Sequence, residues 1–225
     1  MEHIISQQQV LLTEALINHG AALVGYGDIS IRVDELSGAY PVAISFAVKY
    51  DAAIIEDEEQ FHRQLSSLNP VVDELATIIS MKLAEWGYGY KVIPISQIIE
   101  CNEQLDNLNC FSHKFAATRA GLGWIGKNSL LVTPEYGSRV KLCTVLTNAQ
   151  FQTASPVEES KCGNCNRCVQ ACPCGAIKNH NWSAGMRREE LFDAYVCNNW
   201  RLDAIAKIGR KHTCGYCIKA CRGNA

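Results

Sequence analysis

The sequence of 225 residues predicts an α+β fold in two parts, and three observations support this. Strand-like and helix-like patterns alternate along the chain up to about residue 150. A polar stretch over residues 152–156 then interrupts them. Beyond it, nine of the twelve cysteines fall between Cys162 and Cys221. We therefore expect a layered α/β domain over residues 1–153, the front part, and a second domain over residues 154–225, the cysteine-rich part.

The chain is expected to begin with one helix and two strands. Apolar spacing predicts a helix over residues 4–18, and Gly20 ends it. Residues 22–26 form a short apolar run that indicates a buried strand. Residues 41–49 place large apolar side chains at every second position, which is the periodicity of a strand.

The rest of the front part continues the alternation. An apolar stripe predicts helical segments from about Glu58 to Trp86, which Gly87 ends. Asn69-Pro70 either begins a new helix there or kinks a single long one. The remaining predicted elements are a strand over 88–95, a helix over 112–120, and strands over 129–133 and 140–147 joined by a turn at 134–138.

Composition limits the class of protein. A hydrophobic content of 48% is ordinary for a chain that buries a core. The net charge of −2 indicates no basic surface for nucleic acid or an anionic membrane. The N-terminus lacks the basic and then apolar pattern of a secretory signal, and no apolar run approaches the roughly 20 residues of a membrane span. We expect a cytoplasmic protein whose cysteines are metal ligands and not disulfides.

The cysteine spacing is the strongest signal in the chain. Four cysteines and a proline form the run Cys162-x2-Cys165-x2-Cys168-x3-Cys172-Pro173, and a second run is Cys214-x2-Cys217-x3-Cys221. The first run has the bacterial ferredoxin spacing, in which three thiolates hold one iron–sulfur cluster and the fourth binds another. Structural zinc is the main alternative, but zinc sites usually use two separated pairs of ligands. The spacing therefore predicts two [4Fe–4S] clusters.

Counting ligands gives two sets of four. The first set is Cys162, Cys165, Cys168 and Cys221. The second set is Cys172, Cys214 and Cys217 with Cys197 as the preferred fourth ligand. Cys174 is the rival of Cys197, although it lies only two residues from Cys172, where chain stiffness makes joint ligation awkward. The three cysteines of the front part are expected to be small buried apolar residues: Cys101, Cys110 and Cys143.

A glycine-rich loop precedes the cysteines. Its sequence, Gly121-Leu122-Gly123-Trp124-Ile125-Gly126-Lys127-Asn128, satisfies a dinucleotide-binding pattern and nearly satisfies a P-loop. Both sites require a strand before the loop and a helix after it. The predicted order here is the reverse, and Asn128 stands where a P-loop needs a hydroxyl. We therefore exclude an ATP or NAD site.

The chain resembles the epoxyqueuosine reductase family in five features. They are the segment 120–127, the strand after it, the first cysteine run, Cys197 and Cys214-Gly215-Tyr216-Cys217. They are more distantly similar to reductive dehalogenases. The resemblance extends over nearly the whole chain and is specific from about Phe111. It implies a nitroreductase-like α/β sandwich that holds base-off cobalamin beside a ferredoxin-like double [4Fe–4S] module. It also supports the eight predicted ligands.

The chain departs from the family at three places. The family has a catalytic aspartate in an Asp-x-x-Pro segment, where this chain has Asn107 and Cys110; Asp106 is one residue out of register. The family's long members continue into a helical-repeat domain, whereas this sequence stops four residues after Cys221. Arg222 replaces a proline. With the low pI, these departures make tRNA an unlikely partner.

The resemblance also indicates candidate site residues. The catalytic candidates are Asp106, His113 and Tyr136. The candidate cofactor-binding residues are Lys114, Arg119, Gly121, Gly123, Trp124, Gly126 and Lys127. Six of these candidates have a structural alternative: a helix cap for His113, a plain turn for Tyr136, solvated cations for the three basic residues and a core position for Trp124.

Three hypotheses follow. The leading one is an iron–sulfur oxidoreductase that takes electrons from a ferredoxin- or flavodoxin-type donor. Its two clusters reduce a cobalamin, which reduces a small substrate. The alternative is a non-catalytic electron-transfer protein that donates to a partner such as a corrinoid protein, which the missing aspartate favours. The third is a flavin in the front part, for which the sequence has no specific motif.

Overall fold

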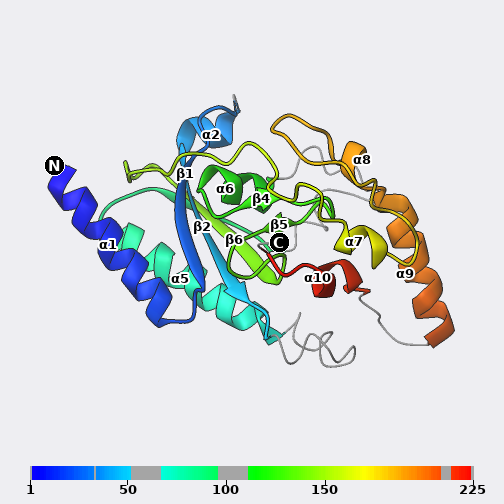
Figure 1. Cartoon of the computed structure of the whole chain (residues 1–225). Helices are drawn as coiled ribbons and strands as arrows, with labels where there is room; N and C mark the ends of the chain where they lie inside the picture. Colours follow the sequence, from blue (N-terminus) through cyan, green and yellow to red (C-terminus); the bar gives the residue numbers. More distant parts are fainter. Residues whose placement is uncertain (1, 33, 52–66, 96–110, 209–213, 224–225) are drawn as a thin grey trace.

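The computed structural model describes residues 2–32, 34–51, 67–95, 111–208 and 214–223, and their fold mixes helices and strands as predicted. A four-stranded sheet in the order β1-β2-β6-β3 lies at its centre, with every pair antiparallel (Figure 1). The strands are β1 (Leu23–Asp28), β2 (Val42–Lys49), β3 (Tyr90–Ile93) and β6 (Val140–Thr147). The predicted strands at 41–49 and 140–147 are confirmed; β1 runs two residues further than predicted, and β3 is shorter.

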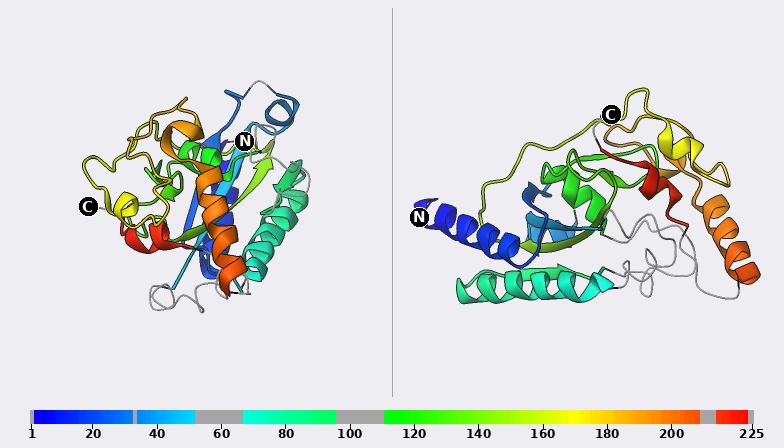
Figure 2. Two further views of the ribbon diagram at one scale, coloured as in Figure 1. Left: turned by 90° about the vertical axis from the view of Figure 1, so that its right-hand side faces the viewer. Right: turned by 60° about the horizontal axis from the view of Figure 1, so that its bottom comes forward.

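Two long helices cover one face of the sheet, as Figure 2 shows. They are α1 (Glu2–Asn18) and α5 (Asn69–Glu85), which has Pro70 in its first turn. Phe46 of β2 and Ile79 of α5 are completely buried in the core between these layers. Gly87 takes a positive φ of 79° just after α5, which is the helix stop that the sequence predicts. Residues 58–66 of the predicted helical segment lie outside the described residues.

The opposite face carries α6 (His113–Arg119). The Ser112 hydroxyl accepts the backbone N–H of Phe115 and caps this helix. The end of α6 lies directly on β1, because a Cβ atom at Gly25 would stand 2.5 Å from the Ala120 carbonyl oxygen. A Cβ atom at Gly27 would similarly stand 2.6 Å from the Ala120 nitrogen. These two glycines fix where the glycine-rich loop leaves the sheet.

The glycine-rich loop forms a small hairpin of its own. Within it, β4 (Trp124–Ile125) pairs with β5 (Leu131–Val132), so the strand predicted over 129–133 is shorter than expected. Ser129 has a positive φ of 58°, which is not a strand conformation, so β5 begins only after this residue. A helix precedes the loop and strand β5 follows it, as predicted, which is the reverse of the order that a nucleotide-binding loop requires.

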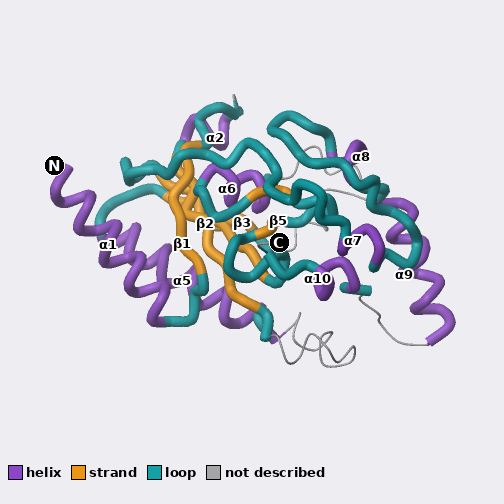
Figure 3. The backbone as a smooth tube through the Cα atoms, in the orientation of Figure 1, coloured by secondary structure: helices purple, strands orange, loops and turns teal. Residues whose placement is uncertain are grey.

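The cysteine-rich part is mostly irregular, as Figure 3 shows. Its helices are α7 (Arg167–Gln170), α8 (Arg188–Leu191), α9 (Ala194–Ile208) and α10 (Tyr216–Ala220). Leu191 packs in one core with Ala117, Leu122 and Ile125 of the front part. The two predicted parts are therefore joined by a common apolar cluster, the shared core, whose members are Ala117, Ala120, Leu122, Ile125, Leu131 and Leu191.

Two further observations complete the fold. A short helix that the sequence analysis did not predict, α2 (Glu35–Ala39), is capped reciprocally by Asp34 and Ser37. Among the described residues, every helix is too short or too polar to span a bilayer.

Candidate iron–sulfur site

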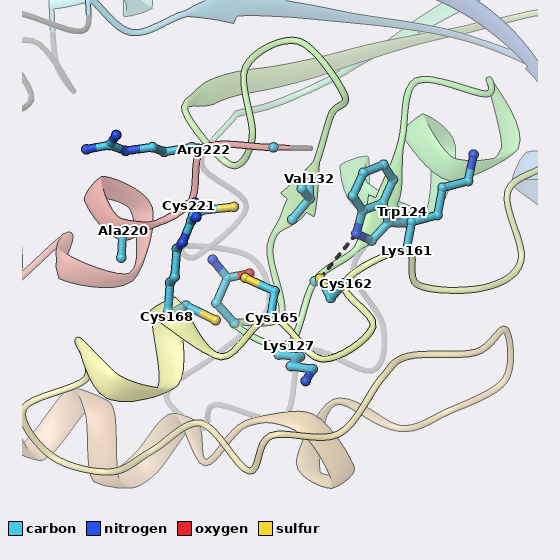
Figure 4. Close-up of a pocket in the computed structure, with 14 residues that line it drawn as sticks. Trp124, Lys127, Val132, Lys161, Cys162, Cys165, Cys168, Ala220, Cys221 and Arg222 are labelled. Carbon is cyan, nitrogen blue, oxygen red and sulfur yellow. Dashed lines mark hydrogen bonds between the residues drawn. The ribbon is translucent and has the colours of Figure 1, made fainter. Parts of the chain in front are cut away.

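The four cysteines of the first predicted set line one pocket (Figure 4). Cys162 and Cys165 come from the loop that leads into α7, Cys168 lies within α7, and Cys221 comes from the chain just after α10. The fold therefore brings together side chains more than 50 residues apart in the sequence.

The thiols of this pocket influence one another. Burial, and after it the neighbouring sulfurs of Cys221, Cys162 and Cys165, raise the pKa of Cys168 to about 11. Thiols that hold their protons this strongly become ligands only when a metal cation compensates the thiolate charge. The chemistry of the pocket therefore fits a cationic iron–sulfur group.

The second predicted set is gathered beside the first. Burial raises the pKa of Cys217 to about 12, and the neighbouring sulfurs of Cys214, Cys168, Cys197 and Cys172 contribute in the same direction. Cys168 belongs to the first set, and its charge raises the pKa of Cys217 in the second set. The two sets are therefore adjacent.

Cys174 also lies at the second set. Its sulfur is 3.7 Å from the sulfur of Cys172, and it interacts with Cys197. Burial raises the pKa of Cys174 to about 11. Five cysteines are therefore available for four positions, and the preference for Cys197 over Cys174 remains a prediction.

The other cysteines belong to the front part. Cys143 is 1% exposed in β6, where its thiol points to the Ile93 carbonyl oxygen at 3.8 Å and burial raises its pKa to about 12. It is a small buried side chain, as expected. Cys101 and Cys110 lie outside the described residues.

The turn at residues 133–137 holds the C-terminal ligands in place. Gly137 has a φ of 59°, and a Cβ atom there would lie 2.5 Å from the carbonyl oxygen of Cys221 and from the nitrogen of Gly223. The Asn128 side chain donates to Ser138 at 3.2 Å and to the carbonyl of Cys217 at 3.4 Å. Residues of the front part therefore set the positions of Cys217 and Cys221.

The glycine-rich loop forms one wall of the cysteine pocket. The Trp124 indole N–H donates to the sulfur of Cys162 at 3.3 Å, and the Trp124 side chain is 3% exposed. Lys127, 4% exposed, also lines the pocket and donates to the Asn179 side chain at 3.0 Å. Hydrogen bonds to ligand sulfurs are a general means of tuning a cluster's reduction potential.

Two other predicted cofactor-binding residues hold the loop to the sheet. The Lys114 ammonium donates to the Ser129 carbonyl at 2.6 Å, and burial lowers its pKa to about 8. The Arg119 guanidinium donates to the Asp28 carbonyl at 2.7 Å. These contacts give both side chains a structural role, and their role in cofactor binding remains a prediction.

The predicted loop glycines permit close backbone packing. Gly121 has a φ of 72°, and Cβ atoms at Gly123 and Gly126 would lie 2.1 and 2.5 Å from atoms of Val132. The absence of side chains at these positions lets the loop lie against β5. A role of the three glycines in cofactor binding is not needed to explain their presence.

Two of the predicted catalytic residues, His113 and Tyr136, do not line the cysteine pocket. His113 has its Nε2 atom 3.1 Å from the Pro94 carbonyl oxygen and its Nδ1 atom 3.0 Å from the Thr144 hydroxyl. Because a carbonyl only accepts, Nε2 carries the proton and Nδ1 accepts from Thr144. Burial lowers the pKa of His113, which favours this neutral form.

Tyr136 lies on the turn that contacts the Cys221 segment, with the Lys49 ammonium 5.9 Å from its ring centre. Asp106 lies outside the described residues. The catalytic roles of all three residues remain predictions.

Sequence reasoning missed three contributors to the site: the Trp124 donor to sulfur, the Asn128 link to Cys217, and the close approach of Gly137 and Gly223. A signal existed only for Trp124 and Asn128, because both stand in the glycine-rich loop that the sequence analysis singled out. The two distant glycines gave no signal, since only the folded chain brings them together.

Comparison with known proteins agrees with the resemblance. The 4Fe-4S binding domain family matches residues 156–178. The epoxyqueuosine reductase of Listeria monocytogenes is 54% identical over 61 residues, which are 27% of this chain and 16% of that protein. The epoxyqueuosine reductase of a Synechococcus strain is 35% identical over 125 residues, 49% of this chain and 39% of that protein. The matches thus span less than half of these relatives.

Solved structures share the fold at low sequence identity. A selenomethionine-labelled epoxyqueuosine reductase aligns over 96% of this chain and 65% of its own, with a TM-score of 0.62 and 21% identity. A reductive dehalogenase, described with B12-dependent dehalogenation, aligns over 90% of this chain and 30% of its own, with a TM-score of 0.66 and 19% identity. An epoxyqueuosine reductase in complex with a tRNA stem loop aligns over 76% of this chain and 52% of its own, with a TM-score of 0.50 and 21% identity. The comparisons support an iron–sulfur oxidoreductase with 4Fe–4S binding.

Proposed function

We propose that this protein is an iron–sulfur oxidoreductase with two adjacent [4Fe–4S] clusters that carry electrons to a cobalamin, which reduces a small substrate. One observation carries the iron–sulfur part of the proposal: residues of the front part and four cysteines line the same pocket. Trp124 donates to Cys162 there, and Lys127 lies in the same wall. A redox centre at this position is in direct contact with the domain that would hold an acceptor.

The chain supplies a suitable ligand set for the proposed clusters. Cys162, Cys165, Cys168 and Cys221 would hold the first cluster. Cys172, Cys197, Cys214 and Cys217 would hold the second. When bound, the clusters supply one-electron transfer. The protein contributes the ligands, their burial and the indole N–H that points at Cys162.

The cobalamin part of the proposal rests on sequence resemblance and on the fold shared with a dehalogenase that uses B12. The residues predicted to bind it fit less well than the cysteines fit iron. Lys114, Arg119 and Lys127 all donate to acceptors within the chain. This engagement favours the second candidate function, in which the protein carries no cobalamin and donates electrons to a corrinoid partner protein.

Iron binding is tested by anaerobic reconstitution followed by metal analysis and electron paramagnetic resonance. We expect about eight irons per chain and the signals of two interacting clusters. Cys165→Ala removes one ligand and should reduce the iron content to about half. Cys143→Ala changes a buried cysteine outside both sets and serves as the matched control. Zinc in place of iron, or an unchanged iron content in Cys165→Ala, would contradict the proposal.

The acceptor is tested by adding cobalamin to the reconstituted protein. Co-elution and a shifted corrin spectrum would support the reductase, with small-substrate reduction as the next measurement. Failure to bind cobalamin, together with rapid reduction of a corrinoid protein, would support the electron-donor function instead. Turnover of a small substrate with only a chemical reductant would exclude the electron-donor function.

A further inference from the structure

Charge is distributed very unevenly along this sequence. Residues 160–188 and 209–225 contain nine of the 21 lysines and arginines and none of the 23 aspartates and glutamates. The remaining residues carry the other 12 basic side chains and all the acidic ones. The segments that bear the ligand cysteines, apart from Cys197, are therefore strongly basic. The net charge of −2 hides this segregation.

Three of these cations surround the first cysteine set. Lys161, Arg167 and Arg222 are exposed, and they line the pocket together with its cysteines. No aspartate or glutamate lines that pocket. The salt bridges found within the described ranges involve other side chains. We name these three residues the basic rim.

The basic rim is accessible from outside. Figure 4 shows the side chains of Lys161 and Arg222 extending away from the cysteines. Between the first two ligands, Gly163 and Asn164 are both exposed. A Cβ atom at Gly163 would meet nothing within 4 Å. The cysteine loop is therefore at the protein surface between its first two ligands.

We propose that the basic rim is the docking surface for an acidic electron-donor protein, such as a flavodoxin. This inference rests on the proposed function and adds to it the place where electrons enter. The exposed side chains of the rim line the same pocket as the buried side chains of Trp124 and Lys127, and the Lys161 ammonium lies 6.0 Å from the centre of the Trp124 ring. Complementary charge accelerates such transient encounters by about 10- to 1,000-fold and matters less for affinity.

An RNA ligand is the competing occupant of a basic surface. Affinity for RNA comes mainly from many phosphate contacts along an extended surface. The basic rim instead places its cations around the mouth of one redox pocket, and the acidic side chains lie outside the two basic segments. These observations favour a partner that must bring its own redox group close to the cysteine loop.

The test measures how fast reduced flavodoxin reduces the reconstituted protein in a stopped-flow experiment at several salt concentrations. Reversal of the rim charges in K161E/R167E/R222E should slow the second-order rate at low salt by at least about tenfold. The difference should shrink as salt screens the charges. The matched control, K49E/K91E/K207E, reverses three exposed cations that do not line the pocket and should change the rate by less than about twofold.

Dithionite separates the failure of this inference from failure of the proposed function. A rim variant that dithionite reduces normally still has working clusters, so an unchanged flavodoxin rate in it would overturn the docking proposal alone. Protein that holds no reducible cluster would overturn the proposed function itself. A third assay measures binding of a tRNA stem loop. RNA binding that the rim variant loses, with the flavodoxin rate unchanged, would assign the rim to RNA and overturn the docking proposal.

Discussion

The front part and the cysteine-rich part are stabilised in different ways. In the front part, two helices pack on a sheet around completely buried side chains such as Phe46, Leu75 and Ile79. Among the described residues from 157 to 223, the buried apolar side chains are only Ala176, Ile177 and Leu191. Burial of apolar area supplies most of the folding free energy of a layered domain. We therefore expect a segment with so little of it to depend on bound metal for its structure.

Removal of iron gives the largest expected difference between the two parts. Chelation should leave the sheet protected from hydrogen exchange and should expose the amides of residues 157–223. Hydrogen exchange read by mass spectrometry before and after chelation measures this. Equal loss of protection in both parts would mean that they unfold as one unit and that the contrast is wrong.

Gly137→Ala tests whether the front part positions a ligand of the cysteine-rich part. The new Cβ atom would lie 2.5 Å from the Cys221 carbonyl oxygen at a φ of 59°, so the Cys221 segment must shift. We expect the iron content after reconstitution to fall by about half. The control is Gly185→Ala, which has a φ of 91° but no atom within 4 Å of its Cβ position. Equal iron losses in the two variants would assign the effect to backbone strain alone.

Leu75→Ala tests whether the front part can be destabilised without loss of iron from the cysteine-rich part. Leu75 is completely buried in the main core, so its truncation should lower the free energy of unfolding of the front part by about 2–5 kcal/mol. Chemical denaturation followed by circular dichroism gives this value. The iron content of the folded variant should be unchanged. A matching loss of iron would show that cluster binding depends on the main core.

Trp124→Phe probes the contact between the two parts without disturbing either core greatly. The variant loses the N–H donor to Cys162 and keeps an aromatic ring. A hydrogen bond contributes about 1 kcal/mol, and about 1.4 kcal/mol corresponds to ~59 mV for one electron. The reduction potential of one cluster should therefore fall by on the order of tens of millivolts. A redox titration monitored by electron paramagnetic resonance measures the shift.

A comparison variant for this titration is Trp182→Phe, at a tryptophan that packs on the shared core. Its cluster potentials should match those of the unmodified protein. Equal shifts in both variants would indicate a packing effect and not a lost hydrogen bond.

Lys114 gives a test by pH. Burial and the charge of Arg188 lower its folded pKa to about 8 from an ordinary value of 10.5. Between these values the unfolded chain binds the proton and the folded chain does not, so stability should rise with pH by up to about 1.4 kcal/mol per unit. Lys114→Met should remove this rise, measured by denaturation from pH 8 to 10.5. An exposed control, Lys91→Met, should retain it.

Local sequence patterns were sufficient to predict most helices and strands of the front part. Alternation of large apolar residues placed β2 almost to the residue, because the period of a strand depends only on neighbouring positions. The strand predicted at 140–147 coincides with β6. Hairpin β4–β5 was not predicted, since it depends on contacts across the glycine-rich loop. Helices α7 to α10 were not predicted either, because segments built around ligands lack the apolar period that marks a helix.

The sequence by itself determined the metal chemistry, because two-residue spacers between cysteines are a local requirement for wrapping a chain around a cluster. It also determined that basic side chains accompany the ligand segments and acidic ones are confined to the rest. Only the tertiary structure decided what surrounds those ligands. The indole of Trp124 contacts Cys162, which lies 38 residues later in the sequence, and Gly137 lies against Cys221, more than 80 residues later. No local sequence pattern predicts contacts between residues so far apart. Such contacts arise from how the loop, turn and C-terminal segment pack, and packing is a property of the whole chain.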